Sequence, residues 1–387
     1  MSSNNSASSS TRALVQLATT PPSLALQPLT LPALGSGSGS SSSAGANGPR
    51  AARLALSHVA QNPTDVQSLD SNAFGEGTVL GCDVLGIVEE VSQGGGEIDF
   101  TAGSAGGSHA GDVAHQVQKG DLLAGLIWGG EHKGLGGYSH HTILPDTRIA
   151  FRIDEELEAR FGRAALSTLP LAAATAELAL FSSSCLGIPQ DDDGKKTPVL
   201  IWGGSSSVGS YAIQLAALRG LQVYTTASPA HHERLRSLGA HEVLDYRSQD
   251  VPALLKERGV SIKHAFDCIG STPTSQACSQ VVGDGTICTV RPGLGGTEKC
   301  LKETRKTDVL VWTVFLTDHA YGPLKWPASE EDHSLGVQLF ENIPQWLKEG
   351  KLVPNQVKLL QGLESVKEGF QMHRDGKLSG EKIVYAI

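Results

Sequence analysis

The sequence predicts an α/β protein, in which an all-β region and a doubly wound, parallel-sheet domain share one chain of 387 residues. Short apolar runs between residues 13 and 144 are separated by Gly, Pro and Asp, as in a series of short strands. From about Ala164 the pattern takes a helical period, and strands then alternate with helices to about Val314. The chain closes with an amphipathic helix over 363–372 and a strand over 382–387, which we expect to return to the β region.

The expected domain boundaries follow these changes of pattern. Residues 1–12 are expected to form a disordered tail, 13–163 and 325–387 the β domain, and 164–324 the parallel-sheet domain. Two segments near 35–48 and 92–112 are rich in Gly and Ser and nearly free of large apolar side chains. Such segments cannot offset the entropy of ordering, so we interpret them as insertions in the β domain.

Composition excludes several classes of protein. A net charge of −9 argues against nucleic acid or an anionic membrane surface as a partner. No apolar stretch approaches the roughly 18 residues that span a bilayer, and the Ser/Asn-rich N-terminus lacks an apolar signal core. The six cysteines are scattered without a C-x-x-C pair, as in reduced cytosolic enzymes. We therefore expect a cytoplasmic protein.

A nucleotide-binding turn is predicted where the apolar run 199–202 meets Gly203-Gly204-Ser205-Ser206-Ser207-Val208-Gly209 and a helical pattern follows. Such a turn directs backbone N–H groups and the positive end of a helix dipole at a pyrophosphate. Because Ser206 replaces the second glycine of G-x-G-x-x-G, a merely structural turn is the alternative. Further strands over 221–226, 242–246 and 264–270 supply the βαβαβ context of a dinucleotide site.

The end of the second strand predicts which dinucleotide binds. NAD enzymes usually place Asp or Glu there for the ribose hydroxyls, whereas this strand runs into Ser228. His231, with His232, Arg234 and Arg236, follows, and Tyr246 closes the next strand. Hydroxyl, imidazole and cationic groups suit a 2′-phosphate. The sequence therefore predicts NADPH.

A set of short motifs gives the chain a resemblance to a known family. They are Asn62-Pro63-Thr64-Asp65, Gly81-Cys82-Asp83-Val84-Leu85-Gly86, Gly136-Gly137-Tyr138, Thr175 in its helix, the Gly204 to Gly209 turn, Ser228-Pro229, Asp245-Tyr246-Arg247, Asp267-Cys268-Ile269 and Leu378-Ser379-Gly380-Glu381-Lys382. The sequence resembles the medium-chain dehydrogenase/reductases, which combine a GroES-like β-barrel domain with a Rossmann domain. Within them it looks most like the zinc-free, NADPH-dependent fungal trans-acting enoyl reductases of polyketide synthesis, and it shares its motifs with quinone oxidoreductases.

The resemblance implies roles for particular residues. Those expected to contact the coenzyme pyrophosphate are Ser206, Ser207, Val208 and Gly209. Those expected around the 2′-phosphate are Ser228, His231 and Tyr246, and Ile269 and Val290 are further expected coenzyme contacts. Asn62, Thr175 and Lys382 are expected near the nicotinamide and its phosphates. The implied partners are a small-molecule or acyl-thioester substrate and a polyketide synthase, and we expect a monomer or homodimer.

Zinc is not expected. The alcohol-dehydrogenase branch needs Cys, His and Cys or Asp ligands that converge on the substrate. Here the first ligand position falls at Asn62-Pro63, the usual Gly-His-Glu reads Gly81-Cys82-Asp83, and the third position matches Leu171. The four-cysteine structural lobe of that branch is also missing. We expect Cys82 to be a small buried core residue.

Without a Lewis acid, conjugate reduction is the easier chemistry, because hydride addition to the β-carbon leaves an enolate that needs only hydrogen-bond donors. The candidate catalytic donors are Asn62, Thr175 and Tyr138, with Tyr321 as a fourth. Tyr138 has the alternative of being a barrel residue with a satisfied hydroxyl. The segment Thr313, Val314 and Phe315 is expected to line the substrate site, although a core strand would look the same.

Two departures from the family pattern bear on function. Gln67 stands where many relatives carry Lys, and His231 stands where several quinone reductases carry Lys.

The predicted function is an NADPH-dependent, zinc-independent reductase of an activated C=C bond. The alternatives are an NADPH quinone oxidoreductase and a non-catalytic dinucleotide-binding protein.

Overall fold

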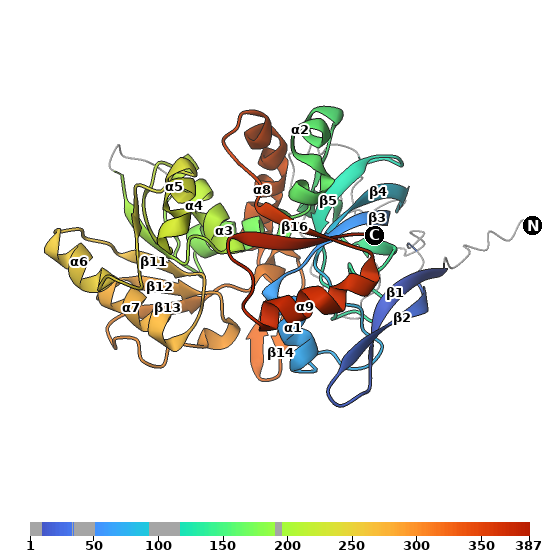
Figure 1. Ribbon diagram of the computed structural model, residues 1–387, viewed down its shortest axis with the longest axis horizontal. Coiled ribbons are helices and arrows are strands. Elements are labelled where there is room, and N and C mark those ends of the chain that lie inside the picture. The colour runs from blue at the N-terminus through green and yellow to red at the C-terminus, as the bar shows by residue number, and fades with distance from the viewer. Residues whose placement is uncertain (1–9, 33, 35–50, 93–116, 190–195) are drawn as a thin grey trace, which may run out of the picture. The chain divides into compact units, whose positions relative to one another are not determined.

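The computed structural model describes residues 10–32, 34, 51–92, 117–189 and 196–387 (Figure 1). The chain forms two compact units. The first, the β unit, contains Met1–Leu171, Gln356–Leu378 and Lys382–Ile387. The second, the α/β unit, contains Ala172–Asn355 and Ser379–Glu381. The predicted fold class is confirmed, because each unit has the predicted sheet type.

The β unit is built on a sheet in the order β16-β17-β3-β4-β5-β7, with β6 paired to β3, and its pairs from β17 to β7 are antiparallel. Its strands are β3 (Ala52–Ala60), β4 (Asp83–Val91), β5 (Leu122–Leu126), β6 (His141–Leu144), β7 (Ala150–Arg152), β16 (Gln356–Gln361) and β17 (Glu381–Ala386). The last strand pairs Val384 with Ala60, so the C-terminus returns to this sheet as expected. A hairpin of β1 (Ser10–Leu17) and β2 (Ser23–Thr30) and the helices α1 (Pro63–Asp70), α2 (Glu155–Leu166) and α9 (Val366–Arg374) complete the unit.

The core of the β unit is aromatic at its centre. Tyr138 meets the rings of Phe370 and Tyr385 edge-on, each at 5.7 Å between centroids, and all three side chains are fully buried. These rings bring together a loop, α9 and β17, so burial of their apolar surface stabilises the packing of the C-terminal segment in the β unit.

The α/β unit contains a six-stranded parallel sheet in the order β10-β9-β8-β11-β12-β13. The strands are β8 (Pro198–Trp202), β9 (Gln222–Thr226), β10 (Glu242–Leu244), β11 (His264–Asp267), β12 (Thr286–Thr289) and β13 (Arg305–Asp308). Taken in chain order within the unit this is 3-2-1-4-5-6, the strand order of Rossmann dinucleotide-binding domains. The order reverses between β8 and β11, and ligands of such sheets bind at that point beyond the carboxyl ends of the strands.

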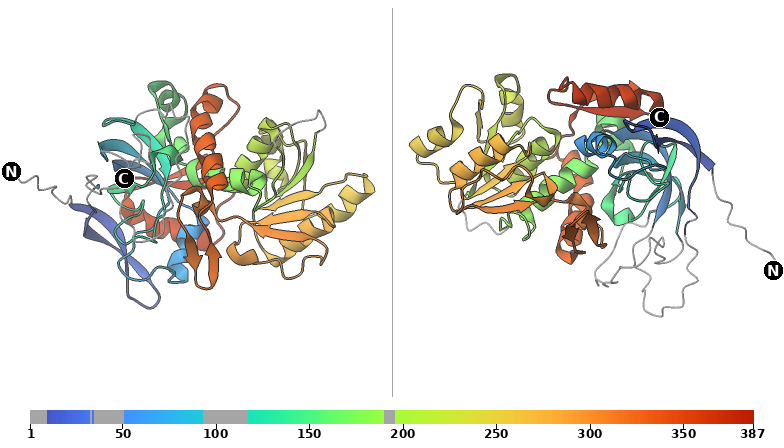
Figure 2. Two further views of the ribbon diagram at one scale, coloured as in Figure 1. Left: turned by 180° about the vertical axis from the view of Figure 1, so that it is seen from behind. Right: turned by 90° about the horizontal axis from the view of Figure 1, so that it is seen from below.

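Helices cover both faces of this parallel sheet (Figure 2). They are α4 (Ser207–Leu218), α5 (His232–Ser237), α6 (Val251–Glu257) and α7 (Thr272–Val282). The apolar side chains of α6 and α7 pack with Trp202, Tyr224 and Leu244 of the sheet. The unit also holds α8 (Glu330–Lys348), the 3-10 turn η4 (Val311–Val314) and the hairpin of β14 (His319–Tyr321) and β15 (Leu324–Trp326). Helix α3 (Pro170–Phe181) begins in the β unit and continues into the α/β unit.

The observed boundaries differ from the expected ones in four places. Residues 164–171, expected in the parallel-sheet domain, belong to the β unit, and residues 379–381, expected in the β domain, belong to the α/β unit. Residues 325–355, expected in the β domain, belong to the α/β unit, because α8 packs against η4. Ser10–Arg12, expected in the tail, form the start of β1. The expected insertions near 35–48 and 92–112, and residues 1–9, lie almost wholly outside the described residues.

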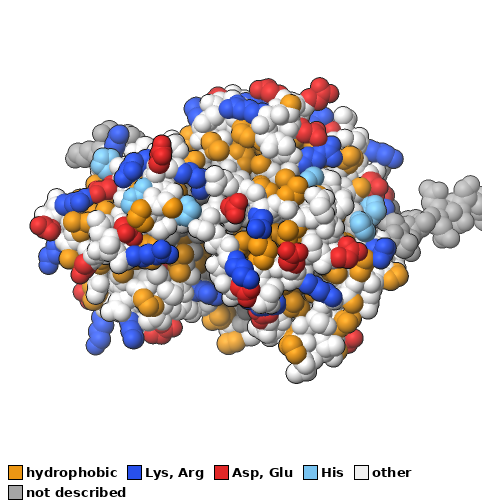
Figure 3. Space-filling model, in the orientation of Figure 1, with side chains coloured by type: hydrophobic (Ala, Val, Ile, Leu, Met, Phe, Trp, Pro, Cys, Tyr) orange, Lys and Arg blue, Asp and Glu red, His pale blue; other side chains and the backbone are white. Residues whose placement is uncertain are grey.

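Charged side chains of both signs are interspersed over the face in Figure 3, and no patch of one sign dominates the described residues there. Within the described part of the chain, no single helix is long and apolar enough to cross a membrane. The helices α2 and α3, bent by 84° where they meet, together have the length and apolar composition of a membrane span, but every residue of α3 is buried in the protein.

Candidate functional site

The glycine–serine turn lies between β8 and α4, next to the point where the strand order reverses. Ser206 caps α4, since its hydroxyl accepts a hydrogen bond from the Gly209 N–H at 3.0 Å. A Cβ at Gly204 would lie 2.2 Å from the Thr225 hydroxyl, and one at Gly209 would lie 2.3 Å from the Gly203 carbonyl oxygen. Both glycines are therefore required by close packing of the turn against the sheet, as in dinucleotide-binding turns.

The other predicted contacts of this turn follow neighbouring strands. Asp267 at the end of β11 accepts hydrogen bonds from the Ile269 and Gly270 N–H groups, both at 3.0 Å. This shapes a loop in which Ile269 lies against Gly203, because a Cβ on that glycine would be 2.7 Å from Ile269 Cδ1. Val290 follows β12 and packs beside Gly270. The structure thus brings Ser206–Gly209, Ile269 and Val290 to one edge of the sheet.

The predicted 2′-phosphate residues follow two adjacent strands, with Ser228 and His231 after β9 and Tyr246 after β10. Ser228 precedes the 3-10 turn η2 (Pro229–His231), and Tyr246, after β10, is 44% exposed. His231 Nε2 lies 3.0 Å from the Ser379 hydroxyl, and a Cβ at Gly380 would lie 2.7 Å from His231 Cε1. The sequence indicated Ser379 only as part of a family motif, so its position beside His231 adds a hydroxyl to this region.

Asp245 precedes Tyr246, and residues of its own loop donate hydrogen bonds to its carboxylate. Ser248 donates to it at 2.7 Å and the Arg247 N–H at 3.1 Å, and these bonds lower the pKa of Asp245. The Arg247 guanidinium lies over the Tyr246 ring at 5.5 Å from its centroid.

A buried ion pair holds Lys382 in the β unit. Its ammonium donates to Asp83 Oδ2 at 2.5 Å and to the Thr168 carbonyl oxygen at 3.2 Å, and Lys382 is 4% exposed. Asn62 Nδ2 also donates to Asp83 Oδ2, at 2.9 Å, and the Leu171 N–H to Asp83 Oδ1, at 2.6 Å. The structure therefore brings together Asn62 and Lys382 through Asp83, which the sequence did not single out for this role. Lys382 neutralises Asp83, rather than presenting an exposed ammonium to a phosphate.

Tyr138 belongs to a second buried cluster, around Asp65. Its hydroxyl donates to Asp65 Oδ2 at 2.9 Å, and the Asn62 N–H donates to the same oxygen at 2.7 Å. Burial raises the pKa of Asp65 to about 6, against the lowering effect of these donors. The hydroxyl of Tyr138 is thus satisfied inside the core, the alternative that the sequence left open, and this placement favours a packing role.

The remaining predicted residues lie in the α/β unit. Thr175 is in α3 and is 8% exposed. In the predicted substrate segment, the Thr313 hydroxyl lies 2.5 Å from Asp332 Oδ2 of α8, Val314 is fully buried and Phe315 is 7% exposed. Tyr321 lies in β14. Asp332 is a buried carboxylate that the sequence pattern did not mark.

Among the described residues, no three His, Cys, Asp or Glu side chains are placed to hold a metal ion. Cys82 is buried with its sulfur 3.5 Å from Asp65 Oδ1, and burial raises the pKa of this thiol. Asp83 is already bound by an ammonium, an amide and a backbone N–H. Cys82 and Asp83, which stand where the zinc branch has the His and Glu of Gly-His-Glu, thus have protein partners.

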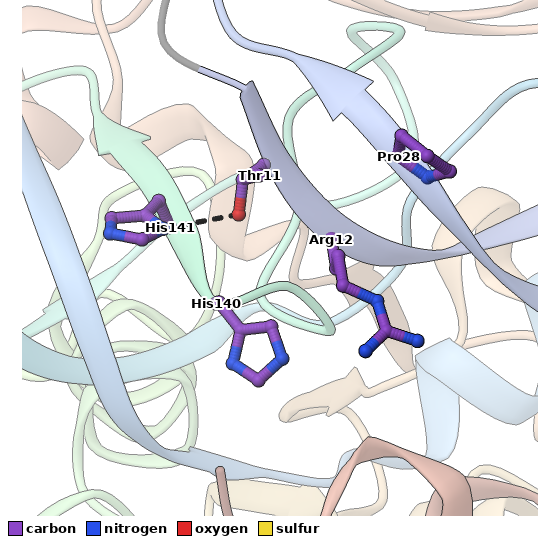
Figure 4. A pocket seen from close by; sticks show the side chains of 5 residues that line it. All are labelled: Thr11, Arg12, Pro28, His140 and His141. Atoms are coloured by element: carbon purple, nitrogen blue, oxygen red, sulfur yellow. Dashed lines mark hydrogen bonds between the residues drawn. The ribbon is translucent and has the colours of Figure 1, made fainter.

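An open hollow of about 310 Å³ lies on the β unit, lined by Thr11, Arg12, Pro28, His140 and His141 (Figure 4). Thr11 and His141 point toward each other and are joined by a 3.1 Å hydrogen bond. None of these side chains is among the predicted site residues.

Comparisons with known proteins agree with this geometry. The zinc-binding dehydrogenase family matches residues 207–309. A trans-enoyl reductase of Macrophomina phaseolina is 30% identical over 348 residues, covering 85% of this chain and 89% of that protein. A zinc-type alcohol dehydrogenase-like protein of Schizosaccharomyces pombe is 26% identical and covers 85% and 90% of the two chains.

Solved structures share the fold. The quinone oxidoreductase of Coxiella burnetii has a TM-score of 0.64 at 20% identity and covers 98% of this chain and 100% of its own. The CurK enoyl reductase has a TM-score of 0.68 at 18% identity and covers 97% and 99%. The relatives, together with the fold, define the class as an oxidoreductase that takes a nicotinamide dinucleotide. The chain belongs to the medium-chain dehydrogenase/reductase superfamily, in which fungal trans-enoyl reductases are among its relatives.

Proposed function

We propose that the protein is an NADPH-dependent, zinc-independent reductase of an activated carbon–carbon double bond, in an enone or an enoyl thioester. The observation that carries the proposal is the turn from Gly203 to Gly209 at the switch point of a 3-2-1-4-5-6 sheet, in a chain whose relatives are named trans-enoyl reductases. Such an acyl thioester fits presentation by a polyketide synthase, which we propose as the partner.

Preference for NADPH is supported by the chemistry at the end of β9. Ser228, His231 and Ser379 offer hydroxyl and imidazole groups, and Tyr246 and Arg247 lie after the adjacent strand β10. The strand itself ends without a carboxylate, which would repel a 2′-phosphate. Ser228, His231 and Tyr246 are proposed to hold the 2′-phosphate, and Ser206–Gly209, with Ile269 and Val290, the pyrophosphate side of the coenzyme.

The chemistry that the bound coenzyme supplies is hydride transfer to the β-carbon of the substrate. The residues of this chain would bind the substrate beside it, exclude water and stabilise the enolate oxygen. We propose Thr175 as a hydrogen-bond donor to that oxygen, and Asn62 as a residue that holds the nicotinamide end. Asp83 fixes the Asn62 amide, so Asn62 needs no reorganisation during the reaction. Thr313, Val314 and Phe315 are proposed to line the apolar part of the substrate site.

Zinc independence is supported by the occupied ligand positions. A catalytic zinc takes three protein ligands and keeps one open position. In this chain Asp83 is neutralised by Lys382, and Cys82 faces Asp65. A divalent ion at Asp83 would have to displace a buried ammonium.

The test is coenzyme oxidation by the purified protein against enoyl thioesters, enones, enals and quinones, with NADPH or NADH and with or without a chelator. We expect turnover of enones or enoyl thioesters with NADPH, and the same rate with the chelator. Rapid turnover of quinones alone would instead identify a quinone oxidoreductase. NADPH binding without turnover of any substrate would indicate a non-catalytic dinucleotide-binding protein.

A further inference from the structure

Helix α4 carries a stripe of polar side chains on one face, at Ser207, Ser210, Tyr211 and Gln214. This spacing of three, four and seven residues places them in line along the helix. Ser210 and Tyr211 are fully buried and Gln214 is 2% exposed, so each polar group needs a protein partner. The partner of the stripe is the segment from Val353 to Asn355, at the end of the α/β unit.

Asn355 binds the first turn of this helix through its side chain. Its Nδ2 donates to the Ser207 hydroxyl oxygen at 2.7 Å, and the Ser210 hydroxyl donates to its Oδ1 at 2.5 Å. The Asn355 N–H donates to the Tyr211 hydroxyl at 3.1 Å. Asn355 is 6% exposed, so the amide is fixed at both ends inside the protein.

This arrangement leaves the proton of Ser207 available. A serine hydroxyl has one O–H donor and two acceptor lone pairs, and Asn355 uses a lone pair. Ser207 is the first residue of α4, where helix N–H groups have no partner within the helix, and its side chain is partly exposed. Its hydroxyl oxygen is therefore held by Asn355, and its proton can be donated at the positive end of the helix dipole.

We propose that Asn355 is a positioning residue for the coenzyme pyrophosphate, acting through the Ser207 hydroxyl. The proposal rests on the proposed function, because it assumes that the turn before α4 binds a dinucleotide. It adds to the site a residue from a distant part of the chain. It also says which part of the coenzyme Asn355 acts on: the pyrophosphate, which NADPH and NADH share, and not the 2′-phosphate.

Affinities of NADPH, NADH and ADP-ribose, measured by titration calorimetry on the full chain, test the proposal. We expect Asn355→Ala to weaken all three by about tenfold, the loss of one oriented donor to a charged group. Asn355→Asp keeps the size of the side chain but replaces the Nδ2 donor by a charged oxygen, so it should weaken them further. It also serves if the alanine variant does not fold. Ser228→Ala should weaken only NADPH.

Gln214→Ala is the matched control. Gln214 holds the same segment through the Val353 backbone, at 2.7 and 3.2 Å, but touches no predicted phosphate contact. We expect it to change the three affinities by less than about twofold, a ratio worth under 0.5 kcal/mol. In a Ser207→Ala background, Asn355→Ala should have no further effect, because the two residues act as one unit.

The outcomes separate this inference from the proposed function. If the unmodified protein binds no dinucleotide, both are overturned. If it binds NADPH while Asn355→Ala binds equally well, or if Gln214→Ala loses as much affinity, only the role of Asn355 is overturned. An equal loss from Asn355→Ala with and without Ser207 would overturn the route through that hydroxyl.

Discussion

Replacing Tyr138 with Phe separates its two possible roles, since the change removes only the hydroxyl. That hydroxyl donates to Asp65 Oδ2 at 2.9 Å in a fully buried cluster. A hydrogen bond to a charged acceptor is worth about 2 kcal/mol, and one to a neutral acceptor about 1 kcal/mol. We therefore expect Tyr138→Phe to lower the free energy of unfolding by about 2 kcal/mol at pH 7.5, where Asp65 is ionised.

The effect should depend on pH in a definite direction. Burial raises the pKa of Asp65 from 3.8 to about 6, so the ionised carboxylate costs stability as the pH rises from about 4 through 6. The Tyr138 donor lowers that pKa and offsets part of this cost. Below the folded-state pKa the carboxyl is neutral, and the loss in Tyr138→Phe should shrink to about 1 kcal/mol at pH 5.

Urea unfolding of the variant at pH 5 and 7.5 measures both values, and Tyr385→Phe is the matched control. Tyr385 lies edge-on to Tyr138 and donates to the neutral amide oxygen of Gln61. We expect Tyr385→Phe to lose a similar amount of stability at the two pH values. The turnover number of folded Tyr138→Phe should stay within about twofold, since a hydroxyl satisfied in the core donates no proton to substrate. An unchanged stability together with a hundredfold loss of turnover would refute this reasoning and make Tyr138 catalytic.

Three further predictions concern the other parts of the site. Lys382→Met leaves the buried Asp83 carboxylate without its cation and should lower the free energy of unfolding by about 3 to 5 kcal/mol. The double variant with Asp83→Asn should recover much of this loss. Additive losses of the two single variants in urea unfolding would contradict the ion pair. Gly209→Ala places a Cβ 2.3 Å from the Gly203 carbonyl oxygen, so calorimetry should show an NADPH affinity lowered by more than about tenfold. Unchanged binding would mean that the turn tolerates a side chain at this position. Ser228→Asp puts a carboxylate at the end of β9 and should weaken NADPH by about tenfold or more without weakening NADH, and an equal effect on both coenzymes would place the 2′-phosphate elsewhere.

Local patterns predicted the parts of the fold that depend on local chemistry. The turn before α4 could be predicted because a buried strand, glycines and a helical period are adjacent in the sequence. The absence of an acid at the end of β9 could be recognised in the same way, since it depends only on the residues at one strand end. The sheet type of each unit followed from the change of period near Ala164.

Contacts between distant residues were out of reach of such patterns. Lys382 was expected near the coenzyme phosphates, whereas its partner Asp83 lies 299 positions earlier in the sequence. The assignment of 325–355 to the α/β unit depends on α8 packing against η4 and on Asn355 reaching Ser207. One signal was present: Ser210 and Gln214 interrupt an otherwise apolar helix, and buried polar groups there require partners.

The division of the chain has a consequence for how this protein can be rebuilt. Neither unit is one continuous stretch, because the chain crosses between them at four junctions, after Leu171, Asn355, Leu378 and Glu381. A fragment that stops at Leu378 loses β17 and the Ser379–Glu381 piece of the α/β unit at once. A chimaera made with a relative by a single crossover would therefore combine parts of each unit from two different proteins. We expect the two units to be exchanged together, as a whole chain, rather than one at a time.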